Sequence, residues 1–198
     1  MSSQWIMTFE KLMTEDEVKA LRVTLEAGAI VAKTKGHQMP VRDHCIIELA
    51  LGTGLRVSEI SQLKLADIDL SRGGNSLIVR KGKGNKQRVV KFSSKLKTLI
   101  LEYLEYRNKS SEYLFPSERQ EYMTPNAIQK VFKKWALKAG LPERYSIHSC
   151  RHYYASALLK VSKNLRLVQQ QLGHSSPQTT TVYAQVLDDE IDEAVEKL

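Results

Sequence analysis

The chain has 198 residues, of which 42% are hydrophobic and 26% charged, and these proportions suit one packed domain of ordinary size. No apolar run approaches the roughly 18 residues that a membrane span needs, and the first residues lack the basic start and apolar stretch of a secretory signal. Two cysteines, Cys45 and Cys150, are too few for a disulfide framework or a zinc site. The composition excludes a membrane protein, a collagen-like fibre, a disulfide-stapled mini-protein and a zinc finger. We expect a soluble, cytoplasmic, basic domain with no metal site.

The positive charge is unevenly distributed along the sequence. Lys and Arg number 30 against 22 Asp and Glu, a net charge of +8. Segment 187–198 has six acidic residues and one lysine, a net −5, so the rest of the chain carries +13. A body this basic attracts polyanions, although a merely solvated basic surface would have the same composition. Ile191, Ala194, Val195 and Leu198 form an apolar helical stripe in the acidic segment, which predicts either a last core helix or a helix that docks on a neighbouring subunit.

The first part of the chain shows helical patterns separated by breaks. A capping box at 14–17, followed by apolar residues at helical spacing, predicts a first helix. The polar segment 32–40 is expected to be a connection. Residues 41–51 predict an apolar, buried helix that ends at the glycines of 52–54, and a short helix is expected over 58–63.

The pattern then changes from helices to strands and back. Segments 76–80 and 87–91 flank a Gly-rich tip at 82–85, which predicts a hairpin in a small antiparallel sheet near residues 66–92. The expected fold class is therefore α+β, mainly helical. Beyond the hairpin we expect an extended piece over 113–116 and helices over 93–106, 124–139, 147–159, 165–172 and 179–186.

Five short stretches carry residues that are suited to chemistry. They are Gly54–Glu59, Gly82–Lys86, His148–His152, Leu172–His174 and Thr179–Tyr183. Taken singly, each has an ordinary structural explanation, such as an ion-paired arginine, a solvated turn lysine or a tyrosine in the core. The glycines near Lys83 do not match a phosphate-binding P-loop, which needs Gly-Lys-Ser/Thr at a helix start.

Taken together and in this order, the stretches resemble the active-site motifs of the tyrosine recombinase (phage integrase) family. The resemblance runs from about residue 14 to residue 186. It rests on an arginine in a GLRxSE-like motif, a hairpin lysine, a His-x-x-Arg pair, a histidine after Leu-Gly, and a tyrosine nine residues beyond. The catalytic residues it implies are Arg56, Lys83, His148, Arg151, His174 and Tyr183, the last as nucleophile. Glu59 matches the acid that accompanies the first arginine. Cys150 and the Tyr153-Tyr154 pair depart from the family's usual residues, which we interpret as changes in packing.

The resemblance implies that the chain cleaves and rejoins DNA strands through a 3′-phosphotyrosyl intermediate at Tyr183, without metal, ATP or another cofactor. A phenol with a pKa of about 10 is only about 0.1% ionised at pH 7, so forming the phenolate costs roughly 4 kcal/mol unless a base or a positive field helps. The two arginines can each direct two N–H groups onto phosphate oxygens, and the two histidines can donate further hydrogen bonds. His148 can also accept the phenolic proton, and Lys83 can protonate the departing 5′-oxygen.

Basic residues outside these motifs are expected to contact DNA phosphates, which positions a protein on the duplex without reading its sequence. They are Arg80, Lys81, Lys86, Arg88, Lys130, Lys133 and Lys134. The expected partner is double-stranded DNA. The resemblance implies a homo-oligomer on DNA, in the family a tetramer that passes a C-terminal segment to the next subunit. A monomer in isolation and accessory DNA-bending proteins are further expectations.

The expected domain organisation is an extension or linker remnant over 1–13, a catalytic domain over 14–186 and a tail helix over 187–198. The N-terminal helical domain that most family members carry is expected to be absent. This leaves either a catalytic fragment or a naturally short recombinase, and it predicts weak, salt-sensitive DNA binding. Two rival functions stay open, namely a type IB topoisomerase, which shares the catalytic residues, and a non-catalytic DNA-binding protein with a degenerate site.

Overall fold

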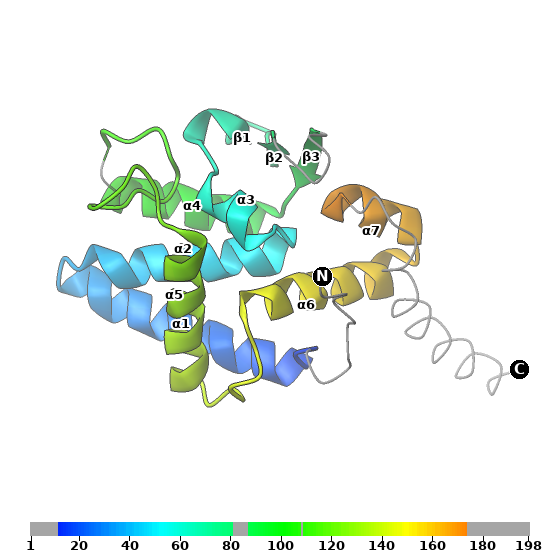
Figure 1. Ribbon diagram of the computed structural model, residues 1–198, viewed down its shortest axis with the longest axis horizontal. Helices are drawn as coiled ribbons and strands as arrows, with labels where there is room; N and C mark the ends of the chain where they lie inside the picture. The colour runs from blue at the N-terminus through cyan, green and yellow to red at the C-terminus, as the bar shows by residue number, and fades with distance from the viewer. Residues whose placement is uncertain (1–11, 81–86, 108, 174–198) are drawn as a thin grey trace, which may run out of the picture.

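The structure, a computed structural model, describes residues 12–80, 87–107 and 109–173 (Figure 1). Its α-helices are α1 (Glu15–Thr34), α2 (Gln38–Thr53), α3 (Val57–Ser61), α4 (Ser94–Tyr106), α5 (Pro125–Lys138), α6 (Ile147–Ser162) and α7 (Leu165–Leu172). A 3-10 turn, η2 (Leu65–Asp67), precedes strands β1 (Ile68–Asp69), β2 (Ser76–Val79) and β3 (Arg88–Lys91). The expected class, α+β and mainly helical with a small antiparallel sheet, is confirmed. Within these residues, no helix combines the length and the apolar character that crossing a membrane requires.

The domain begins with the amphipathic helix α1, which packs along α2. The Thr14 hydroxyl accepts a hydrogen bond from the Glu17 backbone at 3.2 Å, and the Glu17 carboxylate accepts one from the Thr14 backbone at 2.8 Å. The predicted capping box is therefore confirmed. Leu21 and Leu25, one turn apart, are fully buried on the inner face of the helix.

The connection between α1 and α2 is shorter than predicted. α2 begins at Gln38, so Pro40 lies in its first turn, where a missing N–H removes no intrahelical hydrogen bond. α2 also continues through Gly52, where a break was expected, and ends at Thr53, just before Gly54, whose φ of +62° is left-handed. Burial of α2 against its neighbours outweighs the low helix propensity of one glycine.

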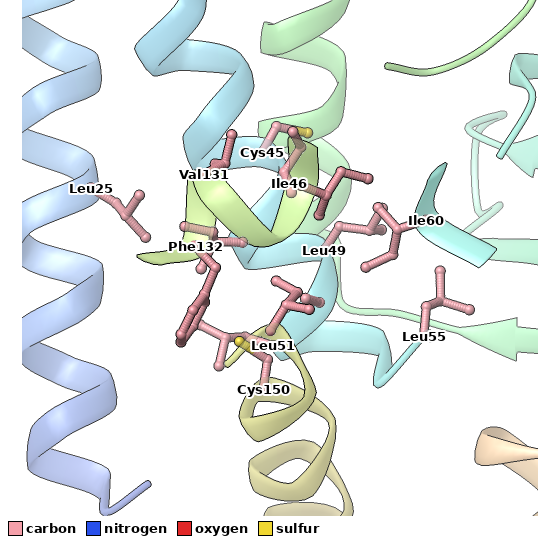
Figure 2. Close-up of a cluster of buried hydrophobic side chains, with 14 of the residues drawn as sticks. Leu25, Cys45, Ile46, Leu49, Leu51, Leu55, Ile60, Val131, Phe132 and Cys150 are labelled. Atoms are coloured by element: carbon pink, nitrogen blue, oxygen red, sulfur yellow. The ribbon is translucent and has the colours of Figure 1, made fainter. Parts of the chain in front are cut away.

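The main hydrophobic core lies where α2 meets α1, α5 and α6 (Figure 2). Leu49 of α2 and Phe132 of α5 are fully buried in it. Cys45 and Cys150 are also fully buried, and burial raises the pKa of both thiols, so they pack as small apolar groups. This core holds α6 in place, and α6 carries two of the predicted catalytic residues.

The sheet has the strand order β1-β2-β3, with both pairs antiparallel. Leu77 of β2 pairs with Ile68 on one side and Val90 on the other. Val79 opposite Arg88 is the described pair nearest the predicted hairpin tip. Helix α7 lies against β3, so the sheet borders the end of α7 (Figure 1).

In the piece predicted to be extended, 113–116, Tyr113 pairs with Lys64 in an isolated bridge, and Leu114 and Phe115 form a bend. The other predicted helices within the described residues agree with the structure. The helices expected over 93–106, 124–139, 147–159 and 165–172 correspond to α4, α5, α6 and α7 to within a few residues. The hairpin tip at 82–85, the helix expected over 179–186 and the tail over 187–198 lie outside the described residues and stay predictions.

Candidate active site

Arg56 stands at the start of the short helix α3, just after the left-handed turn at Gly54. Its backbone N–H donates to the Glu59 carboxylate at 2.8 Å, and its Nη1 atom donates to the same carboxylate at 3.1 Å. The Arg56 side chain is 27% exposed, whereas that of Glu59 is 6% exposed. A buried carboxylate thus orients the arginine and leaves part of the guanidinium accessible.

A second arginine, Arg88 of β3, holds the same carboxylate. Its Nη1 and Nη2 atoms donate to the two oxygens of Glu59, each at 2.8 Å. Burial alone would raise the pKa of Glu59, but the hydrogen bond and charge of Arg88, with the contacts from Arg56, outweigh it and hold the pKa below its usual value. Glu59 is therefore ionised at neutral pH and accepts hydrogen bonds from two guanidinium groups.

His148 and Arg151 lie three residues apart near the start of α6, and so project from one face of the helix. The Arg151 side chain is buried. Its Nη1 atom donates to the Gly54 carbonyl at 2.6 Å, and its Nη2 atom donates to the Leu172 carbonyl at 2.9 Å. The guanidinium therefore sits where α6, the turn before Arg56 and the end of α7 meet.

The imidazole of His148 lies in the field of both predicted catalytic arginines. Burial lowers its pKa, and the positive charges of Arg151 and Arg56 lower it further. The imidazole is therefore neutral at pH 7 and able to accept a proton. The Arg151 guanidinium donates to the Gly54 carbonyl, two residues before Arg56, so the two arginines come close to each other at this turn. We call the group of Arg56, Arg151 and the neutral His148 the cation cluster, after its two guanidinium groups.

The remaining predicted catalytic residues, Lys83, His174 and Tyr183, lie outside the described residues. The elements that lead to two of them are described. β3 follows the hairpin that contains Lys83, and Gly173, with a φ of +66°, ends α7 immediately before His174. The roles assigned to these three residues stay predictions.

The predicted phosphate contacts on the hairpin have different surroundings. Lys81 and Lys86 lie outside the described residues. Arg80 pairs with the buried carboxylate of Asp67 and keeps 57% of its side-chain surface exposed. The Arg88 side chain is only 10% exposed, and its donors point into the domain. The geometry therefore favours an internal role for Arg88 over the predicted phosphate contact.

On α5, the three lysines predicted to contact phosphates are all exposed. Lys133 donates a hydrogen bond to the Glu143 carbonyl. Lys134 lies 3.1 Å from the buried Asp43 carboxylate and is still 48% exposed. The contacts of these two lysines and of Lys130 with DNA stay predictions.

Sequence reasoning missed the contact between Arg88 and Glu59, although a signal was present. Side chains alternate along a strand, so Arg88 shares a face with Val90, which is fully buried. An arginine on the buried face of a strand needs an internal partner. Gly54 and Leu172 contribute only carbonyl oxygens, and no side-chain pattern could have predicted their role.

A hollow of about 650 Å³ opens beside Glu59, bordered by α3, β2 and the tyrosines Tyr113 and Tyr122. None of the residues of the cation cluster lines it, so the hollow adjoins the cluster without being part of it. Over residues 12–80, 87–107 and 109–173, no group of three His, Cys, Asp or Glu side chains gathers as metal ligands would.

Sequence comparison places the chain in a known family. The sequence model described as "Phage integrase family" matches residues 11–190, nearly the whole chain. The chain therefore belongs to the phage integrase family.

Curated relatives are tyrosine recombinases. Tyrosine recombinase XerA of Pyrococcus furiosus is 37% identical over 193 residues, which cover 96% of this chain and 62% of that protein. Tyrosine recombinase XerC of Neisseria meningitidis serogroup B is 39% identical over 153 residues, which cover 76% of this chain and 50% of that protein. The chain thus spans 62% and 50% of the lengths of these two relatives.

Solved structures with the same fold include recombinases bound to DNA. A crystal structure of XerA recombinase has a TM-score of 0.77 at 26% identity, covering 98% of this chain and 67% of that one. XerH site-specific recombinase bound to palindromic difH substrate, a post-cleavage complex, has a TM-score of 0.79 at 26% identity, covering 95% and 53%. A lambda integrase dimer bound to a COC′ core site shares the fold, with a TM-score of 0.65 at 21% identity over 91% of this chain and 48% of that one.

Proposed function

We propose that the protein is a site-specific DNA recombinase that cleaves and rejoins strands through a covalent link to Tyr183. The cation cluster carries the proposal. Arg56 and His148 come from separate elements, Arg151 donates to the Gly54 carbonyl two residues before Arg56, and the buried Glu59 carboxylate holds Arg56. Gathering the guanidinium groups of Arg56, Arg151 and Arg88 in the neighbourhood of this one carboxylate is costly unless a further anion binds. A DNA phosphodiester is the anion that suits the family, in which XerH was solved with its difH substrate.

In the proposed reaction, the Tyr183 oxygen attacks the phosphorus of the scissile phosphate. The Oη–P bond forms while the P–O5′ bond breaks, which leaves a 3′-phosphotyrosyl link and a free 5′-hydroxyl. The phenolic proton passes to His148, which is neutral at pH 7, and Lys83 protonates the departing 5′-oxygen. Attack by a second 5′-hydroxyl reverses these steps and rejoins the strands. The link retains the bond energy, so the proposed reaction needs neither metal nor ATP.

Fixed cations stabilise the transition state, because negative charge builds up on the phosphoryl oxygens. The guanidinium groups of Arg56 and Arg151 suit this role, since each can direct paired N–H donors at a phosphate. His174 is proposed to add a further donor. Removing one such donor typically lowers the rate by about 10² to 10³.

The proposal includes the molecular partners. The substrate is double-stranded DNA, contacted by the basic hairpin and α5. Strand exchange needs two duplexes and a homo-oligomer, which we propose is a tetramer assembled on DNA from monomers. Accessory DNA-bending proteins and a cytoplasmic location complete the proposal.

A pool of nicked duplexes with randomised cores tests the covalent step. Cleavage near the nick releases a short oligonucleotide, so rejoining fails and the covalent complex accumulates. We expect a protein–DNA band that resists denaturation, is removed by protease, is lost in Tyr183→Phe and is kept in the control Tyr153→Phe. A band that survives Tyr183→Phe, or no band with the wild-type chain, contradicts the proposal.

Sequencing of the captured DNA then supplies a defined site for separating the rival functions. A plasmid that carries two such sites should yield recombinant products with the wild-type chain. Relaxation of a supercoiled plasmid without any recombinant would indicate a type IB topoisomerase instead. Binding without cleavage would indicate a non-catalytic DNA-binding protein.

A further inference from the structure

Arg88 contacts two elements of the candidate site besides its own strand. Its terminal nitrogens donate to both oxygens of Glu59 at 2.8 Å, and its Nε atom donates to the Gln171 carbonyl at 3.1 Å. Two residues along, the backbone N–H of Lys91 donates to the Gln171 side chain at 3.0 Å. β3 is thus bound both to the acid behind Arg56 and to the last turn of α7.

The contact with α7 is close enough to require a glycine. A Cβ atom on Gly173 would lie 2.7 Å from the Cδ atom of Arg88, a separation that real Cβ atoms essentially never show. The φ of Gly173, +66°, independently disfavours a side chain there. The stem of Arg88 therefore lies against the backbone at the very end of α7.

Burial restricts the ion pair between Arg88 and Glu59 to one geometry. The exposed fractions of the two side chains are 10% for Arg88 and 6% for Glu59. A two-bonded arginine–carboxylate contact away from water has one favoured geometry, and its charge-assisted hydrogen bonds are the strong kind. Arg88 could bind a phosphate only by giving up this contact.

We infer that Arg88 is a positioning residue. Through Glu59, it fixes the position of the Arg56 guanidinium relative to the end of α7 and to β3, the strand after the hairpin. The inference rests on the proposed function. One side chain links all three parts, so the first arginine, the α7 end and the hairpin are assembled as a unit. Arg88 acts through these neighbours and has no role at the reacting atoms.

The charged groups around Glu59 come from several elements. Besides Arg56 and Arg88, the hollow beside it is lined by Lys64, Asp67, Arg80 and Glu121. Arg80 is paired with Asp67, and Lys64 is paired with Glu112 at 2.8 Å. His148, on α6, lies in the field of Arg56. The cations that hydrogen-bond to Glu59 are thus Arg56 and Arg88, and removing Arg88 leaves the buried carboxylate with one of the two.

Arg88→Gln removes the two-bonded contact and keeps a polar side chain. On the captured nicked duplex, we expect the covalent complex to form roughly 10- to 100-fold more slowly at neutral pH, the range found when a group that orients metal ligands is removed. Non-covalent binding of that duplex, measured in a Tyr183→Phe background, should keep its affinity and its salt dependence. A loss of affinity with a salt slope reduced by about one would mean that Arg88 contacts a phosphate, and would overturn the inference.

Two further measurements distinguish positioning from simple loss of stability. Without Arg88, burial raises the pKa of Glu59, so the rate deficit of Arg88→Gln should grow as the pH falls and shrink as it rises. In a Glu59→Gln background, Arg88→Gln should add little, because both changes break the same contact. Arg88→Lys can keep one hydrogen bond to Glu59 and should recover part of the rate.

Arg22→Gln is the matched control. Arg22 donates to Glu48 at 2.9 Å and joins α1 to α2, outside the contact between Arg88 and Glu59. The Arg22→Gln variant should leave the rate and the pH dependence of cleavage unchanged at temperatures below its unfolding temperature. If Arg88→Gln shows no rate loss, or a pH-independent loss equal to its loss of folded protein, the positioning role is refuted. If the wild-type chain forms no covalent complex, the proposed function fails, and the inference fails with it.

Discussion

The carbonyl oxygens of Gly54 and Leu172 hold the Arg151 guanidinium inside the domain, at 2.6 Å and 2.9 Å. The Gly54 carbonyl depends on a left-handed turn that redirects the chain from α2 toward Arg56. This turn has no room for a side chain, because a Cβ atom on Gly54 would lie 2.5 Å from Cδ1 of Tyr154 and 2.7 Å from Cδ2 of Leu172. One glycine thus controls how the two predicted arginines approach each other.

Gly54→Ala should therefore lower both stability and cleavage. Left-handed strain and the clash with Tyr154 together should reduce the free energy of unfolding by about 3 kcal/mol. Gly36→Ala is the control, because Gly36 has a similar φ of +69° but nothing within 4 Å of an added Cβ. It should cost about 1 kcal/mol from strain alone. Equal losses in urea unfolding would show that the close packing at Gly54 contributes nothing.

The lowered pKa of His148 predicts a pH dependence of stability. Burial, with the charges of Arg151 and Arg56, makes the folded chain bind this proton less readily than the unfolded chain, whose histidine has a pKa of about 6.5. Between the two pKa values the unfolded state binds more protons. The contribution of His148 to stability is therefore complete above pH 6.5 and decreases as the pH falls toward the folded pKa.

An NMR titration of His148 should give a midpoint below pH 6.5. In His148→Gln, the free energy of unfolding should fall less steeply as the pH is lowered. His44, whose pKa burial also lowers, should preserve part of that slope in the variant. A midpoint above 6.5 would contradict the placement of this imidazole beside two guanidinium groups.

Among the elements, α5 connects the core helix α2 to the helix that carries His148. The Gln129 side chain on α5 accepts a hydrogen bond from the Ile147 backbone, the first residue of α6, at 3.2 Å. On the other side, the buried Asp43 of α2 accepts from Trp135 at 2.9 Å and from Lys134 at 3.1 Å. The position of α6 therefore depends on a carboxylate that lies on another helix.

Asp43→Asn should weaken this connection. Asp43 is 1% exposed and also accepts from Arg42 at 2.9 Å, so the change removes the charge that compensates two cations. Both cations are partly exposed and can rehydrate, so we expect a loss of about 2 kcal/mol in denaturant unfolding. Glu15→Gln, which breaks the exposed pair with Lys160, should cause no measurable change. Similar results for both variants would refute the special role of Asp43.

Local patterns predicted most of the described helices, because capping residues and apolar periodicity act within a few turns. The errors at Pro40 and Gly52 occurred where burial of α2 outweighs local signals. In the site, motifs predicted Arg56, His148 and Arg151, but the hydrogen bonds between Arg88 and Glu59 join residues 29 positions apart. Such pairing depends on how β3 packs against α3, and local sequence patterns do not predict that packing.

For the molecule as a whole, the net charge of +8 conceals two opposed parts, a body of +13 and a segment 187–198 of −5. The body should attract DNA. The acidic segment should weaken that attraction wherever it comes within a Debye length of the DNA, about 10 Å at 0.1 M salt. The same segment carries the apolar stripe that is expected either to pack on its own subunit or to dock on a neighbouring one. Deleting it would change charge and assembly together, so two separate variants are needed.

The first variant converts the six acidic residues of 187–198 to amides and keeps the stripe. It should bind non-specific duplex several-fold more tightly at about 50 mM salt, and the difference should disappear as salt increases.

The second variant changes Ile191, Val195 and Leu198 to serine and keeps the acids. If the stripe docks on a neighbouring subunit, this variant should bind and cleave a single duplex normally. It should, however, form fewer two-duplex complexes in sedimentation and less recombinant product. A lower unfolding temperature with impaired cleavage of a single duplex would show instead that the stripe packs on its own subunit, because assembly between duplexes plays no part in that measurement.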